Sequence, residues 1–280
     1  MVTFSHIPFS LPIASSDFQG KPDLSHLTVE QEIKQEMIGC SAAMRRLRLQ
    51  VRRIGPHFRT VLVYGERGVG KETVARALHQ VNAGRDDPFV VSAEGNRIDS
   101  LMKIARRGTL FFHEISEMPL VTQDEFLKIL RRHEWAREGL AAPQRIGPRI
   151  IAATHRDLRT LAVGGGFRQE LYQRLTMVQM GVAPLRERRE DIPALAAHFL
   201  DRFAREQRKS IVTMTKEALE RLQLHEWPGN VRELEGTVRE AVSRCSGDTL
   251  TERELPEFAL PLPTDGDASP ESGQKTARLQ

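Results

Sequence analysis

The sequence predicts an α/β protein in which a parallel sheet is covered by helices on both faces and followed by a small helical domain. Short apolar runs alternate with helical patterns up to residue 182, which is typical of parallel strands joined by helices. These runs are Val61–Tyr64, Phe89–Val91, Thr109–Phe112, Arg149–Ala153 and Met177–Val182. After Pro184 the strand pattern ends and apolar residues recur at helical spacing, which predicts the helical domain.

The first element is a helical segment that we expect to begin at Glu30. Its apolar residues recur every three or four positions and form one stripe: Met44, Leu47, Val51 and Ile54. A basic stripe of Arg45, Arg48 and Arg52 lies beside it. We interpret the arginines as a solvated face, because no aromatic residues are interleaved as in many single-strand nucleic-acid surfaces.

The helical domain contains a clear break between two predicted helices. Apolar residues repeat at helical spacing over residues 192–203 and 218–222, and Trp227-Pro228-Gly229 breaks the chain. Asn230 is then expected to be an N-cap, with Glu233 as its capping-box partner. We therefore predict a flexible leader over residues 1–30, an α/β domain over 31–185, a helical domain over 186–255 and a disordered tail over 256–280.

Composition favours an ordinary globular protein of the cytoplasm. The 280 residues are 40% hydrophobic and 28% charged, and the formal net charge of +4 permits phosphate ligands without demanding them. Cys40 and Cys245 are far apart in sequence, which favours reduced thiols. The first residues lack a basic start, Pro8 and Pro12 interrupt them, and no apolar run reaches membrane-spanning length. We expect neither a signal peptide nor a membrane anchor.

The segment Gly65–Glu72 carries the strongest functional signal. It joins an apolar strand to a helical pattern, and its glycines let the backbone wrap around an anion. We predict that Gly65, Glu66, Arg67, Gly68, Val69, Gly70 and Lys71 hold phosphates, since backbone N–H groups and the helix N-terminus attract negative charge. Glu72 stands where a Ser or Thr commonly holds Mg²⁺. The alternative is a glycine-rich turn that binds nothing.

Further motifs identify a family. They are Met37-Ile38-Gly39, Gly65–Glu72, Gly108–Ile115, Arg149–His155, Phe167-Arg168, Arg174, Pro184–Arg188 and Trp227–Leu234. In this order and spacing the chain resembles, from about Met37 to about Cys245, the AAA+ domain of bacterial enhancer-binding proteins, the NtrC-like sigma-54-dependent transcriptional activators. The resemblance implies an AAA+ P-loop fold, a three-layer α/β arrangement with a small C-terminal helical lid.

The resemblance also implies roles for individual residues, with ATP or ADP and Mg²⁺ as cofactors. Glu114, in the Walker B strand, would orient the attacking water. Arg168 and Arg174 would act as arginine fingers on a neighbouring subunit's nucleotide. The remaining cofactor contacts would be Ile38 and Gly39 beside the adenine, Thr154 in the sensor strand and Arg232 at the γ-phosphate, with Glu72 and His113 nearest the metal, His113 through water.

Three departures from the family pattern limit this expectation. His113 replaces the Walker B aspartate, so the metal would lack a negative ligand there. The segment from Phe89 to Gly108 is too short to hold the family's GAFTGA loop, and Ala93 replaces an asparagine that restrains the catalytic glutamate. No helix-turn-helix pattern follows the lid, where prolines are frequent.

These features leave three hypotheses open. The chain is a transcription regulator that hydrolyses ATP slowly, a pseudo-ATPase that only binds nucleotide, or an accessory subunit in a mixed ring with a complete activator. In each case we expect a homo-oligomer or a mixed ring with a related AAA+ activator, no DNA-reading module and no membrane contact. Without the loop, we do not expect direct remodelling of sigma-54 by this chain alone.

Overall fold

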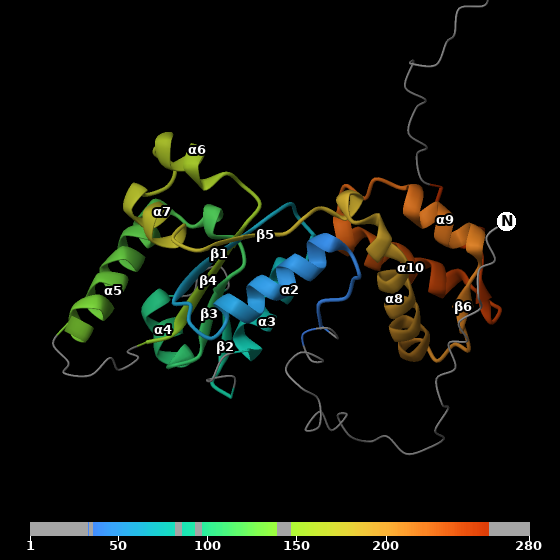
Figure 1. Ribbon diagram of the computed structural model, residues 1–280, viewed down its shortest axis with the longest axis horizontal. Helices are drawn as coiled ribbons and strands as arrows, with labels where there is room; N and C mark the ends of the chain where they lie inside the picture. The colour runs from blue at the N-terminus through green and yellow to red at the C-terminus, as the bar shows by residue number, and fades with distance from the viewer. Residues whose placement is uncertain (1–32, 34–35, 82–85, 93–96, 139–146, 258–280) are drawn as a thin grey trace, which may run out of the picture.

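The computed structural model describes residues 33, 36–81, 86–92, 97–138 and 147–257, with residues 133–138 described by their backbone only. The predicted leader over residues 1–30, Ala93 and the tail from residue 258 lie outside the described residues. Figure 1 shows two parts: the sheet with helices α2–α7 at one end, and α8, α9 and α10 at the other.

Five parallel strands form the sheet, as the apolar runs predict. They are β1 (Thr60–Tyr64), β2 (Phe89–Ser92), β3 (Thr109–Phe112), β4 (Arg149–Thr154) and β5 (Gln179–Gly181). Their order is β2-β3-β4-β1-β5, with β1 between β4 and β5. The carboxyl ends of β1, β3 and β4 therefore meet at one edge, which brings the segments that follow them together.

Alternate residues of each strand face opposite layers of helices. Val61 and Val63 of β1 pack with α2 (Ala42–Ile54) and α3 (Lys71–Gln80). Leu62 packs with α4 (Ile98–Ala105), α5 (Leu120–Glu138), α6 (Leu158–Val163) and α7 (Gln169–Leu175). Because both faces are buried, the strands read as continuous apolar runs instead of alternating ones.

The first helix differs from its prediction. α2 begins at Ala42, capped by Ser41, whose hydroxyl accepts a hydrogen bond from the backbone N–H of Met44 at 3.1 Å. Gly39 has a left-handed φ of 141°, which separates α2 from the helical turn containing Ile33 and Glu36. The helical period alone could not reveal this break.

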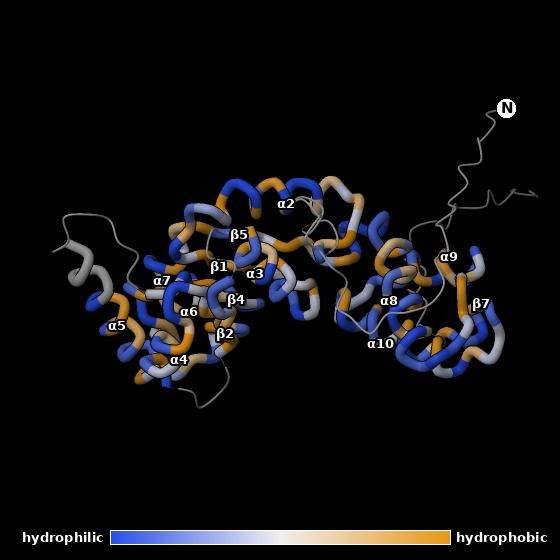
Figure 2. The backbone as a smooth tube through the Cα atoms, turned by 90° about the horizontal axis from the view of Figure 1, so that it is seen from below, coloured by the Kyte–Doolittle hydropathy of each residue, from blue (hydrophilic) through white to orange (hydrophobic). Residues whose placement is uncertain are grey.

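The helical part has a separate hydrophobic core. α8 (Ile192–Glu206), α9 (Lys216–Leu224) and α10 (Asn230–Arg244) surround the fully buried Trp227. Two strands, β6 (Thr213–Met214) and β7 (Thr249–Leu250), pair at its edge and were not predicted, because two residues leave no readable period. Figure 2 shows the same separation of the two parts from below.

Short 3₁₀ helices complete the described elements: η1 (Ile115–Glu117), η2 (Leu185–Glu187) and η3 (Arg189–Asp191). η2 and η3 lie in the connection between β5 and α8. No helix in the described part of the chain is both long and apolar enough to cross a bilayer.

Candidate functional site

A pocket of about 620 Å³ lies between the sheet and the helical part, and its size is within the usual range for small-molecule sites. Its walls come from α2, the loop before α3, the end of β3, and helices α8 and α10. The predicted site residues that line it are Ile38, Arg67, Gly68, Val69, Gly70, Lys71, Glu72, His113, Glu114 and Arg232. Gly39, Gly65, Glu66, Thr154, Arg168 and Arg174 do not line it.

Lys71 lies at the start of α3 and closes the glycine-rich loop. Its Nζ donates hydrogen bonds to the carbonyl oxygens of Gly65 (2.8 Å) and Glu66 (2.9 Å). Burial lowers the pKa of Lys71, and the charges of Arg232 and Arg67 add to this effect while Glu114 opposes it. The ammonium group is thus held against the loop, and its contact with a phosphate stays a prediction.

The loop is in direct contact with the helical part. Gly68 has φ +76°, and a Cβ added there would lie 2.1 Å from the carbonyl oxygen of Gly229. The backbone N–H of Arg232 donates to the carbonyl oxygen of Gly68 at 3.2 Å. Only glycine allows this approach, so the loop and the start of α10 are packed backbone to backbone.

Asn230 joins the two parts and is not the helix cap that the sequence predicts. Gly229 is the N-cap of α10, and its N–H donates to Glu233 Oε2 at 2.6 Å. The fully buried side chain of Asn230 instead accepts from the N–H of Leu185 at 2.7 Å. Its amide donates to Glu66 Oε2 (3.1 Å) and to the carbonyl oxygen of Arg67 (3.0 Å).

Glu66 therefore contacts the helical part and not the pocket. Arg186 of η2 donates to both of its carboxylate oxygens, at 2.8 and 2.5 Å. The hydrogen bonds from Arg186, and next those from Asn230, lower the pKa of Glu66 to about 2. Glu66 stays charged at neutral pH and links the loop to the chain that enters the lid.

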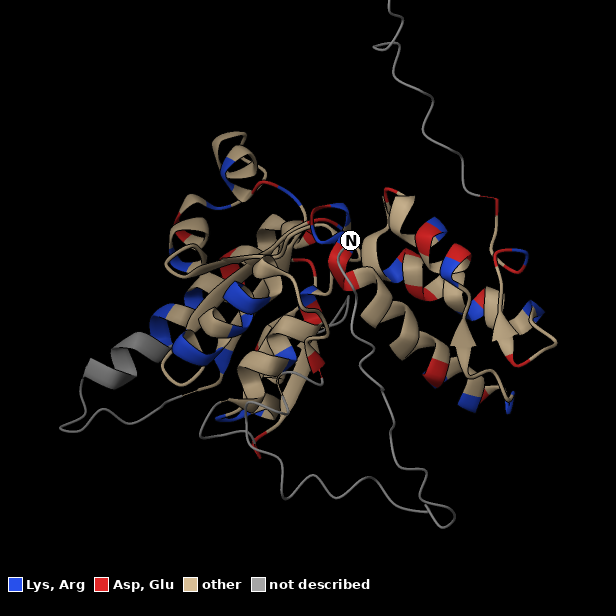
Figure 3. Cartoon of the chain, turned by 45° about the vertical axis from the view of Figure 1, so that its right-hand side comes forward, with Lys and Arg blue, Asp and Glu red and all other residues tan. Residues whose placement is uncertain are grey.

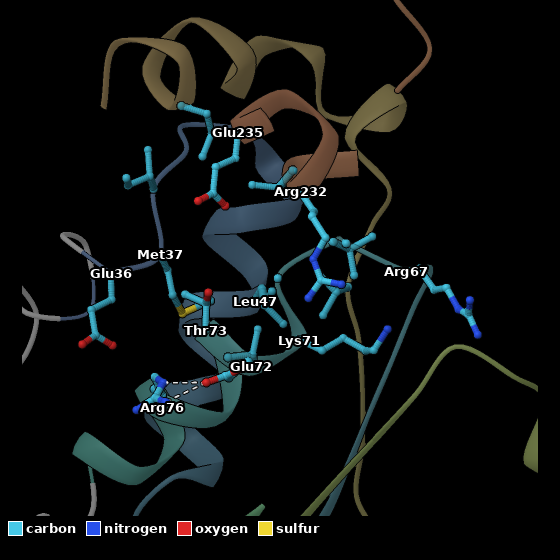
Figure 4. Close-up of a pocket in the computed structure, with 18 of the residues that line it drawn as sticks. Glu36, Met37, Leu47, Arg67, Lys71, Glu72, Thr73, Arg76, Arg232 and Glu235 are labelled. Atoms are coloured by element: carbon cyan, nitrogen blue, oxygen red, sulfur yellow. Dashed lines mark hydrogen bonds and ion pairs between the residues drawn. The ribbon is translucent and has the colours of Figure 1, made fainter. Parts of the chain in front are cut away.

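Arg232 brings a second positive charge into the pocket, from α10. In Figure 4 its guanidinium group and the ammonium group of Lys71 enter the same space, while Arg67 points away from both. Arg67 lies 3.5 Å from Glu117 in an exposed ion pair. Among the described residues the Arg232 side chain makes no hydrogen bond or ion pair. Arg232 lies in the first turn of α10, and its contact with a phosphate stays a prediction.

The segment Met37–Gly39 forms the opposite wall and is fixed from two sides. Arg48 of α2 donates to the carbonyl oxygens of Met37 (2.8 Å) and Gly39 (2.9 Å). The buried carboxylate of Asp191 accepts from the N–H groups of Cys40 (2.6 Å) and Ser41 (2.7 Å). Arg48 is thus half-buried and structural, which corrects its interpretation as part of a solvated face. Arg45 likewise donates to the carbonyl oxygen of Cys40, at 2.6 Å.

Glu114 follows β3 and is half-buried at the edge of the pocket. Its Oε1 accepts from the hydroxyl of Ser116 at 2.7 Å, and its Oε2 lies 2.6 Å from His155 Nδ1. Burial, the strongest single influence, acts to raise the pKa of Glu114. Hydrogen bonds from Thr154, His155 and Ser116 outweigh burial and lower this pKa. The side chain is therefore an oriented carboxylate, the form that a water-positioning residue needs.

His113 and Glu72, the two residues predicted nearest the metal, have different surroundings. His113 is exposed beside the pocket, with its ring edge-on to Phe111 at 6.0 Å between centroids. Glu72 accepts hydrogen bonds from Nε (3.0 Å) and Nη2 (2.6 Å) of Arg76 one helical turn later, as Figure 4 shows. Within the described residues no three His, Cys, Asp or Glu side chains gather into a metal site. Mg²⁺ prefers oxygen ligands, and His113 has none in its side chain, while Glu72 would have to leave its ion pair with Arg76 to bind a metal.

Arg168 and Arg174 lie outside the pocket, around α7. Arg168 donates through Nε (2.8 Å) and Nη2 (2.7 Å) to the two carboxylate oxygens of Asp124. Arg174 donates to Glu170 at 3.0 Å, and Arg131 contacts the same glutamate. Figure 3 shows such positive and negative residues on the helices and loops around the sheet. Neither arginine lines the chain's own pocket, and their role on a neighbouring subunit stays a prediction.

Sequence reasoning missed four residues that hold the site together: Arg48, His155, Asp191 and Asn230. The pattern around Asn230 matched a capping box, which concealed its long-range contacts. His155 could have been found, since it follows Thr154 at the same sheet edge as Glu114. Thr154 itself accepts from the N–H of Arg156 at 3.0 Å and orders the turn after β4.

Comparison with known sequences decides the family. The pattern described as "Sigma-54 interaction domain" matches residues 37–103 and 91–181, and that of the "AAA+ ATPase lid domain" matches residues 186–271. The chain belongs to the sigma-54 interaction domain family. The two matches to its pattern overlap at residues 91–103, inside the segment that is short for the GAFTGA loop.

Two relatives illustrate the similarity. The transcriptional regulatory protein ZraR of Escherichia coli K12 is 39% identical over 243 residues, covering 79% of this chain and 55% of ZraR. The Nif-specific regulatory protein of Herbaspirillum seropedicae is 36% identical over 240 residues, covering 77% of this chain and 44% of the relative. The chain thus spans about half the length of these regulators.

A solved structure confirms the predicted fold. NtrX from Brucella abortus in complex with ATP has a TM-score of 0.69 and 29% identity, covering 85% of this chain and 60% of NtrX. The predicted α/β AAA+ fold with a helical lid is therefore correct.

Proposed function

We propose that this chain is an ATP-binding AAA+ transcription regulator with weak ATP hydrolysis. One observation carries the proposal: Lys71 from the loop and Arg232 from the lid bring positive charge into one pocket, beside the oriented carboxylate of Glu114. The ATP-bound and ADP-bound structures of NtrX support it. The loop and Lys71 hold the phosphates, and Ile38 borders the base.

In this proposal each side chain has a role that its environment supports. Glu114 orients the water that attacks the γ-phosphate, because hydrogen bonds keep its carboxylate ionised and fixed. Arg168 and Arg174 reach the nucleotide of a neighbouring subunit, where an arginine finger contributes roughly 10³–10⁵ in rate. If Mg²⁺ is bound with the ATP phosphates, it would supply further positive charge there, and Glu72 and, through water, His113 would be the side chains available to it.

A pseudo-ATPase is the second candidate, and His113 is the observation that favours it. A neutral imidazole at this position supplies no negative oxygen to a metal. In either case we propose a cytoplasmic oligomer of this chain, or a mixed ring with a complete activator through which it acts on sigma-54. The short segment at residues 91–103 supports the indirect route.

Nucleotide binding is tested with Lys71→Ala. Removing a charge-assisted contact should weaken ATP binding roughly tenfold to a hundredfold in calorimetry. Lys103→Ala is the matched control, since Lys103 is exposed on α4 outside the pocket. If the parent and Lys71→Ala bind ATP with equal affinity, the proposal that this pocket binds nucleotide is wrong.

The shared site is tested by mixing two variants. Glu114→Gln lacks the water-orienting carboxylate, and Arg168→Ala lacks the finger. Each alone should release phosphate at least tenfold more slowly than the parent, with ATP affinity intact. A mixture should regain activity, because some interfaces then combine an intact Glu114 with an intact Arg168. If the mixture does not recover activity, and the protein sediments as a monomer with an ATP analogue, then Glu114 and Arg168 do not form a site between two subunits.

A further inference from the structure

The side of the pocket where His113, Glu114 and Glu72 lie, which we call the metal side, offers few oxygen ligands to a metal ion. His113 has no oxygen atom in its side chain and is exposed. The carboxylate of Glu72 is taken by Arg76, through hydrogen bonds of 3.0 and 2.6 Å. His113 cannot supply the negative oxygen that a hard cation prefers, and Glu72 would have to give up its ion pair with Arg76.

Two other carboxylates that line the pocket, Glu114 and Glu117, are also engaged, whereas one oxygen of Glu36 has no hydrogen-bond partner in the described part of the chain. Both oxygens of Glu114 take part in hydrogen bonds, one with Ser116 and one with His155. Glu117 is half-exposed and lies 3.5 Å from Arg67 in an ion pair. A metal that bridges the phosphates and Glu72, Glu114 or Glu117 would therefore have to displace an existing partner of that carboxylate.

Two positive side chains, Lys71 and Arg232, lie in the same pocket. Lys71 is fixed by two loop carbonyl groups, and Arg232 enters from α10 without a partner among the described residues. Lys71 is 8% exposed, so its charge is only partly screened by water. These two cations supply the positive charge that a metal often supplies to nucleotide phosphates.

We infer that the chain's own cations, Lys71 and Arg232, hold the nucleotide phosphates and that nucleotide affinity does not depend on Mg²⁺. The inference rests on the proposed nucleotide binding and specifies its cofactor requirement. A nucleotide without metal carries more negative charge, and the two cations Lys71 and Arg232 attract that charge. Linkage then requires that the bound nucleotide keep the metal affinity that it has in solution.

The test measures binding of ADP and of a non-hydrolysable ATP analogue by calorimetry, in excess Mg²⁺ and in EDTA. The dissociation constant in EDTA should be no more than about threefold above that in Mg²⁺. A larger loss in EDTA overturns the inference while leaving the proposed function in place. Absence of binding in both buffers overturns the proposed function and the inference with it.

His113→Asp is the diagnostic variant. A carboxylate at this position repels metal-free phosphates and attracts the metal, so binding in EDTA should become at least about tenfold weaker than in Mg²⁺. His57→Asp, an exposed site outside the pocket, is the matched control and should leave the ratio unchanged. An unchanged ratio in His113→Asp would mean that this position does not govern metal dependence, and would overturn the inference.

Mn²⁺ provides a direct readout of the metal. Its affinity for ADP alone and for the ADP complex of the full chain can be compared by electron paramagnetic resonance. The inference expects equal Mn²⁺ affinity within about threefold. Markedly tighter Mn²⁺ binding in the protein complex would overturn it, because the chain would then be supplying metal ligands.

Discussion

The two sides of the pocket differ in what their polar groups do. On the loop side, Lys71 donates to the carbonyl oxygens of Gly65 and Glu66 within the loop. Glu66 joins the loop to the lid through its hydrogen bonds with Arg186 and Asn230. On the side where β3 ends, Glu114 is held in place but its neighbour is the exposed imidazole of His113. Under the proposed function, phosphate binding and metal-dependent hydrolysis would rest on separate groups of residues, so that one could change while the other is retained.

The largest effect should follow from placing a side chain between the loop and the lid. Gly68→Ala puts a Cβ 2.1 Å from the carbonyl oxygen of Gly229, at a φ of +76°. Overpacking and left-handed strain together should lower the free energy of unfolding by about 2–4 kcal/mol. ATP affinity should fall as well, since the loop can no longer pack against α10. Urea unfolding and calorimetry measure the two effects.

Gly236→Ala is the control for this change. Gly236 lies within α10, and an added Cβ would meet nothing within 4 Å. Alanine should therefore raise the free energy of unfolding by about 0.5–1 kcal/mol through better helix propensity. If Gly68→Ala were as stable as the parent, the loop and lid would not be packed as described.

A smaller effect should follow from restoring a negative charge at residue 113, on the side of the pocket where β3 ends. His113→Asp returns a negative oxygen beside the phosphates, so metal-dependent turnover should rise by roughly tenfold, equivalent to about 1.4 kcal/mol in the barrier. Phosphate release at saturating ATP and Mg²⁺ measures the change, with Glu114→Gln as the inactive reference. If turnover does not change while Glu114→Gln is inactive, His113 is a competent substitute and the metal side is not impaired.

The strands were predictable because a sheet buried on both faces leaves continuous apolar runs. Val61, Leu62 and Val63 pack into two different layers, yet all three are apolar and read as one strand. The loop was predictable because its glycines and Lys71 act through local backbone geometry. Their chemistry needs no knowledge of distant residues.

Contacts between distant residues were not predictable in the same way. Asp191 binds Cys40 and Ser41 across about 150 positions, and Asn230 binds Glu66 across 164. No local period encodes such a pair. Asn230 was even misread, because Glu233 satisfies the capping pattern with Gly229 one residue earlier.

The smallest effect should come from Glu66→Gln, and its size depends on pH. Arg186, then Asn230, lower the pKa of Glu66 to about 2, below its ordinary value of 4.5. The folded state therefore favours the ionised form, and this stabilisation is complete above pH 4.5 and is lost as the pH falls toward 2. Since the carboxylate is 41% exposed, solvent screening limits the contribution to about 0.5–1 kcal/mol.

Urea unfolding of the parent and Glu66→Gln at pH 7 and at several values below 4.5 tests this dependence. The parent should be the more stable at pH 7, and the difference should shrink as the solution is acidified, because a protonated glutamate and a glutamine are both neutral. Glu117→Gln is the matched control, since its pair with Arg67 is longer and more exposed, and its effect should stay within about 0.5 kcal/mol. A difference that persists unchanged at low pH would show that Glu66 acts through its shape and not its charge. The contact between the loop side and the lid would then be one of packing, supported mainly by Gly68 and Asn230.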